Sequence, residues 1–310
     1  MTTLRIGTRG SALAMWQAEW VRDALVRAHP GLEVRLEVIR TAGDRVKQAP
    51  LPAVGGTGIF TKEIEAALLD GAVDVAVHSL KDLPTRLPDG LALSAVPARE
   101  DPADALVAAS GLTLDTLPQG GELLTGSPRR RAQVLHRRPD LRISPVRGNV
   151  QTRVRRFEES GADAMVLALA GLVRLGLGGR IAERLEPAEF VPAPGQGALG
   201  VETRADDARA IALCRALDVA ELRLAVTAER AFLADLGGGC QVPVGAYGRF
   251  GAAAGELTLT GMVAEADGRR LLKRTMTSAA ASEAEARELG RGLAEALRAD
   301  GAQALLGGSP

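Results

Sequence analysis

Short apolar strands alternate with helical segments along the first third of the chain. Residues 4–7 and 34–41 alternate apolar and polar side chains as strands do, and an amphipathic helix is expected between them, over residues 11–28. A second helix is expected over about 61–70, before a strand at 73–77. This alternation predicts an α/β fold, with a parallel or mixed sheet and helices on both faces.

A second set of strands and helices is expected beyond residues 97–102, where the chain leaves the first group of elements. The expected strands are 105–108, 123–125, 143–146 and 164–169, and the expected helices are 129–136 and 149–160. Residues 192–195 have the composition of a hinge, and residues 198–202 are expected to return to the first sheet. One crossing out and one back predict two lobes joined by two connectors, with a cleft between them.

The character of the sequence changes again after about Val219. The expected elements are a helix over 221–236, strands near 244–247, 257–263 and 271–277, and a closing helix over 282–298. This order is typical of a separate α+β domain. We therefore expect three domains, which are residues 1–97 with about 198–218, residues 98–197, and residues 219–310.

Composition excludes several classes of protein. The 310 residues carry a formal net charge of zero, which argues against a globally basic binder of nucleic acid. The first residues lack the apolar core of a signal peptide, and the longest apolar run, 164–173, is too short to span a bilayer. Two cysteines cannot make a disulfide framework, and three scattered histidines do not form a metal pair. We therefore expect a soluble cytoplasmic protein without a metal ion and without a membrane or nucleic-acid partner.

Positive charge is concentrated between Thr125 and Arg156, where ten arginines stand against one acid, Asp140. Arg129 and Arg130 open an expected helix, and Arg147 directly precedes another. Because helix N-termini offer unpaired N–H groups, arginines at these junctions make strong sites for carboxylates or phosphates. Nucleic acid could use such a patch, but the stretch has no aromatic residue for base stacking. Solvated surface is the alternative interpretation, and it is favoured for Arg131, Arg137, Arg138, Arg155 and Arg156.

The segment Val73–Pro84 begins as a strand and breaks at His78-Ser79-Leu80-Lys81-Asp82. In an open α/β sheet, ligands bind beyond the carboxyl ends of the strands, where Lys81 and Asp82 would stand. His78 is expected to be a packed residue that orients this loop. The alternative is that Asp82 only caps a turn before Pro84.

The two cysteines differ in their surroundings. Cys214 lies in a helical pattern beside Leu213 and Leu217 and is expected to be a small buried apolar residue. Cys240 directly follows three glycines. Because glycine lets the backbone approach a ligand closely, a reactive or modified thiol is expected at Cys240.

Six motifs occur in the order in which one enzyme family has them. They are Arg9-Gly10-Ser11, His78-Ser79-Leu80-Lys81-Asp82, Thr125-Gly126-Ser127-Pro128-Arg129-Arg130, Arg147-Gly148-Asn149, Gly195-Gln196-Gly197 and Gly239-Cys240-Gln241-Val242-Pro243. Together they closely resemble the porphobilinogen deaminase (hydroxymethylbilane synthase) family, from Leu4 to about Leu305.

The resemblance implies a transferase of porphyrin and heme biosynthesis. Members of the family join four porphobilinogen molecules head to tail into hydroxymethylbilane and release ammonia at each addition. Their primer is a dipyrromethane cofactor, held by a thioether to the cysteine that matches Cys240. The family fold is two lobes like a type II periplasmic binding protein, with mixed sheets, plus a small C-terminal α+β domain. The resemblance also implies a cytoplasmic monomer.

The resemblance carries residue roles as well. Loss of ammonia from an aminomethylpyrrole leaves a cationic azafulvene, so a fixed carboxylate is needed, and Asp82 is the expected one. The positions that match cofactor- and substrate-binding residues are Arg9, Ser11, Lys81, Thr125, Ser127, Arg129, Arg130, Arg147, Asn149, Arg153, Arg174 and Gln196. The positions that match a mobile loop are Gly55, Gly56, Thr57, Gly58 and Phe60.

The sequence departs from the family pattern at a few positions. Many relatives have lysine where this chain has Ala53 and Thr57, and Gly126 and Pro128 alter the usual Thr-Ser-Ser-Leu-Arg-Arg motif. An alternative from another class is a two-lobed anion-binding or sensor protein without catalysis. That alternative would explain the lobes and the arginines, but it gives no reason for three glycines before Cys240.

Overall fold

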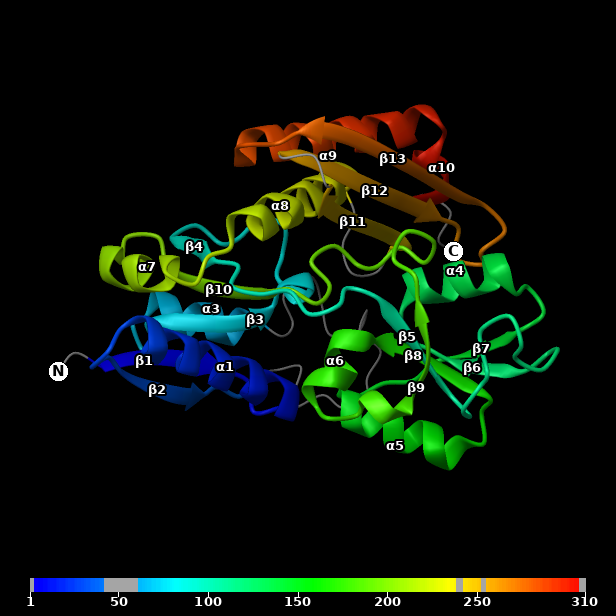
Figure 1. The fold of residues 1–310 in the computed structure, drawn as a ribbon, viewed down its shortest axis with the longest axis horizontal. Coiled ribbons are helices and arrows are strands. Elements are labelled where there is room, and N and C mark those ends of the chain that lie inside the picture. The colour runs from blue at the N-terminus through cyan, green and yellow to red at the C-terminus, as the bar shows by residue number, and fades with distance from the viewer. Residues whose placement is uncertain (1–2, 42–60, 238–241, 252–254, 307–310) are drawn as a thin grey trace. The chain divides into compact units, whose positions relative to one another are not determined.

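The structure is a computed structural model, which describes residues 3–41, 61–237, 242–251 and 255–306. The chain divides into two compact units, whose elements are labelled in Figure 1. The first unit is Met1–Glu100 with Gly197–Arg223, and the second is Asp101–Gln196 with Leu224–Pro310. Each unit is therefore assembled from two separate segments of the chain. In the described ranges, no helix combines the length and the apolar character needed to cross a bilayer.

The first unit contains a mixed sheet of five strands in the order β2-β1-β3-β10-β4. The strands are β1 (Thr3–Thr8), β2 (Glu33–Val38), β3 (Val75–Ser79), β4 (Leu91–Ala95) and β10 (Leu199–Arg204). β1 pairs in parallel with β2 and β3, whereas β10 runs antiparallel to both β3 and β4. The strand that returns from the second unit is thus inserted between β3 and β4.

Helices cover both faces of this sheet, as the alternating pattern predicts. The helices are α1 (Ala12–Ala28), α3 (Lys62–Leu69) and α7 (Ala208–Arg215). On one face, Val75 and Val77 pack with Val21 of α1. On the other face, Ala76 packs with Ile64 of α3. The alternation along β3 therefore directs neighbouring residues into two separate cores.

The sheet of the second unit repeats the plan of the first. Its order is β7-β6-β8-β5-β9. The strands are β5 (Asp104–Ala108), β6 (Glu122–Leu124), β7 (Arg142–Ser144), β8 (Ala164–Ala168) and β9 (Ile181–Leu185), and the helices are α4 (Pro128–Arg137), α5 (Val150–Ser160) and α6 (Leu169–Arg174). β5 is antiparallel to its neighbours β8 and β9. In both units the antiparallel strand is the first one after the chain crosses from one unit to the other, β5 in the second unit and β10 in the first. This repeated order confirms the predicted fold class of two α/β lobes with mixed sheets.

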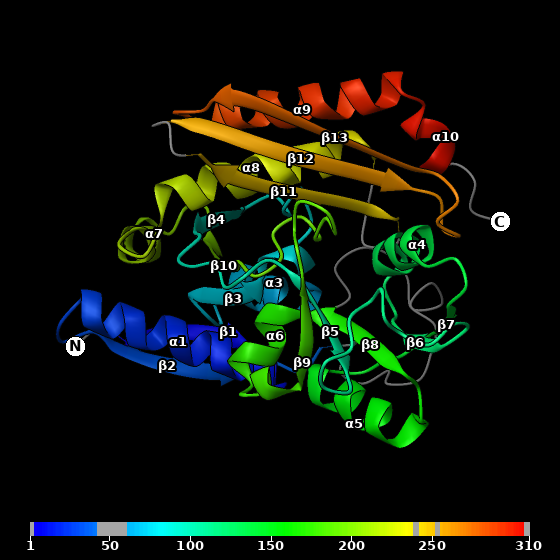
Figure 2. The same cartoon turned by 45° about the vertical axis from the view of Figure 1, so that its right-hand side comes forward.

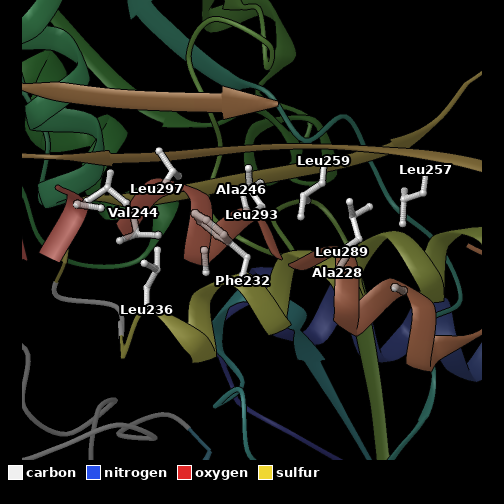
Figure 3. Close-up of a cluster of buried hydrophobic side chains, with 14 of the residues drawn as sticks. Ala228, Phe232, Leu236, Val244, Ala246, Leu257, Leu259, Leu289, Leu293 and Leu297 are labelled. Atoms are coloured by element: carbon white, nitrogen blue, oxygen red, sulfur yellow. The ribbon is translucent and has the colours of Figure 1, made fainter. Parts of the chain in front are cut away.

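The C-terminal part forms an antiparallel sheet of three strands in the order β11-β12-β13 (Figure 2). Its elements are α8 (Ala220–Asp235), β11 (Val244–Phe250), β12 (Glu256–Ala264), β13 (Leu271–Ala279), α9 (Glu283–Ala299) and α10 (Ala302–Leu306). Phe232 of α8 and Leu293 of α9 pack against one face of the sheet, beside Leu259 (Figure 3). A Cβ atom built on Gly261 would lie 2.7 Å from the ring of Phe232, so the strand carries no side chain there. The predicted α+β architecture of this part is confirmed.

The opposite face of the three-stranded sheet packs on α4, which is in the same unit. Ala132 of α4 and Met262 of β12 belong to one buried cluster. Nδ1 of His136 lies 2.9 Å from the carbonyl oxygen of Gly268, in the turn between β12 and β13. Gly268 has a φ of +75°, and a Cβ atom there would lie 2.5 Å from the carbonyl oxygen of Ala132. The β12–β13 hairpin therefore packs directly against α4, the helix that carries Arg129 and Arg130.

Candidate active site

Asp82 stands directly beyond the carboxyl end of β3, the middle strand of the first sheet. It ends the short 3-10 helix η2 (Leu80–Asp82), which follows β3 without a gap. Leu80 and Leu83 on either side are 0% and 5% exposed, and the backbone N–H of Leu80 donates to the carbonyl of Ala198 at 3.0 Å. These contacts fix the turn in the core, whereas Asp82 itself is exposed.

A pocket of the first unit gathers polar side chains around Asp82. Its lining includes Arg9, Ser11, Gln17, Thr61, His78, Ser79 and Asp82. The backbone N–H of Ala14 donates to Ser11 Oγ at 3.4 Å, so Ser11 caps α1 as the sequence predicts. A guanidinium and a carboxylate thus share one pocket, and such a pocket can bind a small molecule that carries both charges.

Among the polar residues of the pocket, Gln17, Thr61 and Ser79 have no role expected from the sequence. Gln17 is 2% exposed, and its Nε2 lies 2.9 Å from Ser79 Oγ. It lies four residues before Val21 on the buried side of α1, so a lone polar residue within an apolar stripe is the feature that could have identified it. His78 is 6% exposed, as expected for a packed residue.

In the second unit, two helix N-termini follow neighbouring parallel strands. The loop after β6 leads into α4, whose cap Ser127 Oγ accepts from the N–H of Arg130 at 3.4 Å. Beyond β7, the cap of α5 is Asn149, whose Oδ1 accepts from the N–H of Thr152 at 2.8 Å. A Cβ atom on Gly126 would lie 2.6 Å from the carbonyl oxygen of Val146, so the two loops touch. This contact explains why glycine stands at position 126.

Arg129 and Arg130 lie inside the second unit and hold a buried acid that the sequence did not indicate. They are 4% and 5% exposed, and Asp104 at the start of β5 is fully buried. Arg129 Nη1 lies 2.7 Å from Asp104 Oδ2, and Arg130 Nη2 lies 2.8 Å from Oδ1. Gln196 Nε2 donates to Asp104 Oδ1 at 2.9 Å, and Arg129 Nη1 donates to the carbonyl of Val191 at 2.7 Å. Two arginines against one acid leave a net positive charge at the start of α4.

Burial alone would raise the pKa of Asp104, but the charges of Arg129 and Arg130 outweigh it and hold the pKa far below its ordinary value. The acid is therefore ionised throughout the neutral range. The arginine pair is oriented by Asp104 from inside the lobe, and its part in binding a ligand stays a prediction.

The other predicted arginines differ in exposure. Arg147, before α5, and Arg153, within it, are half-buried, and Arg174 at the end of α6 is 8% exposed. Arg153 Nε donates to the carbonyl of Gly148 at 2.7 Å. Among the arginines expected on the surface, Arg131, Arg137, Arg155 and Arg156 are exposed, and Arg138 is half-buried in an ion pair with Asp140.

Two family models match nearly all of the chain. Residues 4–212 match the dipyromethane cofactor binding domain of porphobilinogen deaminase, and residues 223–299 match the C-terminal domain of the same enzyme. The chain belongs to the porphobilinogen deaminase family.

Relatives within this family are similar along their whole length. The porphobilinogen deaminase of Syntrophotalea carbinolica is 53% identical over 305 residues, which cover 98% of this chain and 95% of the relative. That of a Roseiflexus species is 51% identical over 306 residues, which cover 99% of each.

Solved structures with some likeness include two binding proteins. The L-cystine solute receptor of Neisseria gonorrhoeae has a TM-score of 0.42 at 16% identity, over 69% of this chain and 85% of the receptor. A nutrient binding protein from Burkholderia cenocepacia bound to methionine has a TM-score of 0.43 at 15% identity, over 71% and 93%.

The described residues fit the cofactor that gives the family domain its name. A dipyrromethane built from two porphobilinogens carries four carboxylates, and the second unit offers capped helix N-termini next to arginines, which are suitable donors for them. Burial raises the pKa of Cys214 to about 12, so this thiol is a packed residue, as expected, and a poor nucleophile. Cys240 and the expected mobile loop with Gly55, Gly56, Thr57, Gly58 and Phe60 lie outside the described residues, as does Ala53.

Proposed function

We propose that the chain condenses four porphobilinogen molecules head to tail into hydroxymethylbilane, with release of ammonia at each addition, and that Asp82 is its catalytic carboxylate. Membership of the deaminase family supports the reaction. The observation that carries the role of Asp82 is the pocket at the carboxyl end of β3, where an exposed carboxylate stands with Arg9 and the helix cap Ser11. Porphobilinogen has both an aminomethyl group and two carboxylates, so it needs both kinds of partner.

The chemistry assigns Asp82 two tasks. When the C–N bond of the protonated aminomethyl group breaks, the nitrogen leaves as ammonia with the bonding electrons, and the positive charge passes to the pyrrole. A carboxylate fixed in advance stabilises this charge without reorganisation of solvent. After the new carbon–carbon bond forms, Asp82 accepts the proton that the coupled ring carbon loses.

The remaining predicted residues bind carboxylates of the substrate and of the growing chain. In the first unit these are Arg9, Ser11 and Lys81. In the second unit they are Thr125, Ser127, Arg129, Arg130, Arg147, Asn149, Arg153, Arg174 and Gln196. Each porphobilinogen adds two carboxylates, so the charge to be bound grows with every addition. Buried Asp104 supports this role, because it holds two arginines at the N-terminus of α4 with one positive charge to spare.

The dipyrromethane would be tethered through a thioether to Cys240, and it supplies a fixed end on which the product is extended. A thioether resists the reductants of the cytoplasm, where we place the protein as a monomer. The proposed domains are residues 1–97 with about 198–218, residues 98–197, and residues 219–310.

Incubation with porphobilinogen and measurement of ammonia and hydroxymethylbilane tests this function. The wild-type protein should release four ammonia molecules per product, whereas a binding protein without catalysis would release none. Asp82→Asn keeps the shape of the side chain and removes its charge, so turnover should fall by about a hundredfold or more. Asp89→Asn, an exposed acid of the same unit, is the matched control and should turn over normally. Near-normal turnover of a folded Asp82→Asn protein would refute the assignment.

A further inference from the structure

Three titratable side chains lie buried together in the first unit: Glu65 of α3, His78 of β3 and Glu202 of β10. They are 5%, 6% and 0% exposed. In the antiparallel pairing of β3 and β10, Glu202 lies opposite Ala76, and Gly200 lies opposite His78. His78 and Glu202 therefore point to the face of the sheet that α3 covers, and His78 Nε2 lies 3.2 Å from Glu202 Oε2.

Glu65 enters the same layer from the helix side. Burial raises the pKa of Glu65, and the nearby charge of Glu202 raises it further. A hydrogen bond from the Thr61 side chain and the charges of His78 and Lys62 oppose this shift without cancelling it. The pKa of Glu65 is thus raised, and a second carboxyl group, which pairs with a histidine, lies nearby.

This cluster of buried titratable groups lowers the stability of the fold, and it lies next to the pocket that contains Asp82. Within the described ranges, Oε1 of Glu65 and Oε1 of Glu202 have no hydrogen-bond partner. Buried polar atoms without partners destabilise a fold, and an apolar pair of similar volume would pack more favourably. The two residues that these acids hold, Thr61 and His78, both line the pocket that contains Asp82. Each buried glutamate therefore contacts one residue that lines the pocket, Glu65 contacting Thr61 and Glu202 contacting His78.

We propose that Glu65 and Glu202 are positioning residues of the condensation reaction, which hold Thr61 and His78 in place as the inner wall of the Asp82 pocket. The inference rests on the proposed placement of the reaction in this pocket. His78 lies in β3 and Asp82 ends η2, which follows β3 without a gap. A displacement of the His78 ring is therefore transmitted through the backbone to the catalytic carboxylate.

The test combines steady-state kinetics with nitrogen NMR of the histidine rings. The variants are Glu202→Gln, Glu65→Gln and Glu65→Ala, with Asp70→Asn as control, because Asp70 is exposed at the C-terminal end of α3. The chain has three histidines, so a sample labelled only in histidine can be assigned by single substitutions. His29 and His136 bond to backbone carbonyls and serve as internal references.

In Glu202→Gln, kcat for porphobilinogen should fall at least tenfold while the thermal unfolding transition stays cooperative. The ring nitrogens of His78 should shift, and those of His29 and His136 should not. Glu65→Gln keeps the size and the hydrogen-bonding groups of the side chain, so it should turn over at least fivefold faster than Glu65→Ala. Asp70→Asn should match the wild type in every measurement.

The proposal is overturned if Glu202→Gln keeps kcat within twofold, or if the loss equals the fraction of protein that is unfolded. It is also overturned if Glu65→Gln is no faster than Glu65→Ala. The assignment of Asp82 is judged separately, by Asp82→Asn. The NMR shifts of His78 report whether Glu202 holds the ring even if that assignment fails.

Discussion

Asp104 is the buried centre of the charged group in the second unit, and loss of its charge should destabilise the protein strongly. The carboxylate is fully buried between Arg129 and Arg130, at 2.7 and 2.8 Å. Asp104→Asn keeps the shape and one hydrogen-bonding oxygen. It leaves two guanidinium groups, each about 5% exposed, without a counter-charge.

The magnitude follows from the burial. Removal of one partner of a buried ion pair costs about 3–5 kcal/mol, because the remaining charge stays desolvated. Since asparagine keeps part of the hydrogen bonding, we expect about 3 kcal/mol, a large share of a total stability of about 5–15 kcal/mol. The matched control is Asp115→Asn. Asp115 pairs with Arg137, but the two side chains are 56% and 38% exposed, so this variant should cost at most about 1 kcal/mol.

Denaturant unfolding of the variants and the wild type, followed by circular dichroism, measures both effects. The pKa of Asp104 is held below its ordinary value, so its stabilisation is fully present above the pH range in which an unfolded carboxyl titrates, about 3.9. It is lost only as the pH falls toward the lower pKa of the folded state. The difference between wild type and Asp104→Asn should therefore stay constant from pH 8 to pH 5 and shrink below about pH 4.

A second substitution separates charge from packing. Asp104→Asn combined with Arg129→Met removes one of the two unpaired charges and should recover part of the lost stability. Equal losses in Asp104→Asn and Asp115→Asn, or no recovery in the double variant, would contradict the account of a buried acid that balances two arginines.

Three further predictions concern the tether, the anion site and the hairpin. Intact mass after denaturation in excess reductant should show a surplus of two linked pyrrole units, which Cys240→Ser lacks and Cys214→Ala keeps; an unmodified mass in active wild type would exclude the tether. Arg147→Gln should weaken primer loading or stall elongation, because each lost carboxylate contact costs about 1.5–3 kcal/mol of binding free energy, whereas Arg137→Gln should elongate normally. Identical product distributions from the two variants would argue against a division into ligand-binding and solvent-exposed arginines. Gly268→Ala should lower the unfolding midpoint, because its φ of +75° and the close carbonyl of α4 leave no room for a methyl group; an unchanged midpoint would show that the turn is loose.

Central strands and helix caps could be predicted from the sequence because local rules decide them. Val73, Val75 and Val77 alternate with smaller or polar residues as strands do, and β3 overlaps the expected strand 73–77, although it begins and ends two residues later. Ser127 and Asn149 cap the expected helices, since a short polar side chain before a helix satisfies an N–H group within three residues. No distant part of the chain is needed for either inference.

Features that depend on distant partners were missed. β9 was not expected, because it is an edge strand with a mixed sequence, and only its pairing with β5 defines it. The buried face of α1 includes the polar residue Gln17, whose partner Ser79 lies 62 residues away in the sequence. In the sequence, Asp104 is only a polar residue at the start of a strand. Its pairing with Arg130 becomes evident only in the folded structure. The partners that make such polar residues stable inside a protein lie far off in sequence.

The repeated sheet plan explains how one chain separates two kinds of chemistry. In the two sheet orders, β1 of the first unit occupies the same position as β6 of the second. Each of these strands leads through a short turn into a helix capped by serine, Ser11 or Ser127. The middle strand is β3 in the first sheet and β8 in the second. Each runs directly into a short helix that ends in a charged residue. In the first unit that helix ends in Asp82, and in the second it ends in Arg174. At equivalent positions of the two lobes, the first therefore has a carboxylate, which would suit a developing cation, and the second has a guanidinium. The second lobe has Arg174 at the position equivalent to Asp82, and Arg129 and Arg130 lie in the first turn after its cap Ser127, so these positions suit a product that gains two carboxylates at each addition.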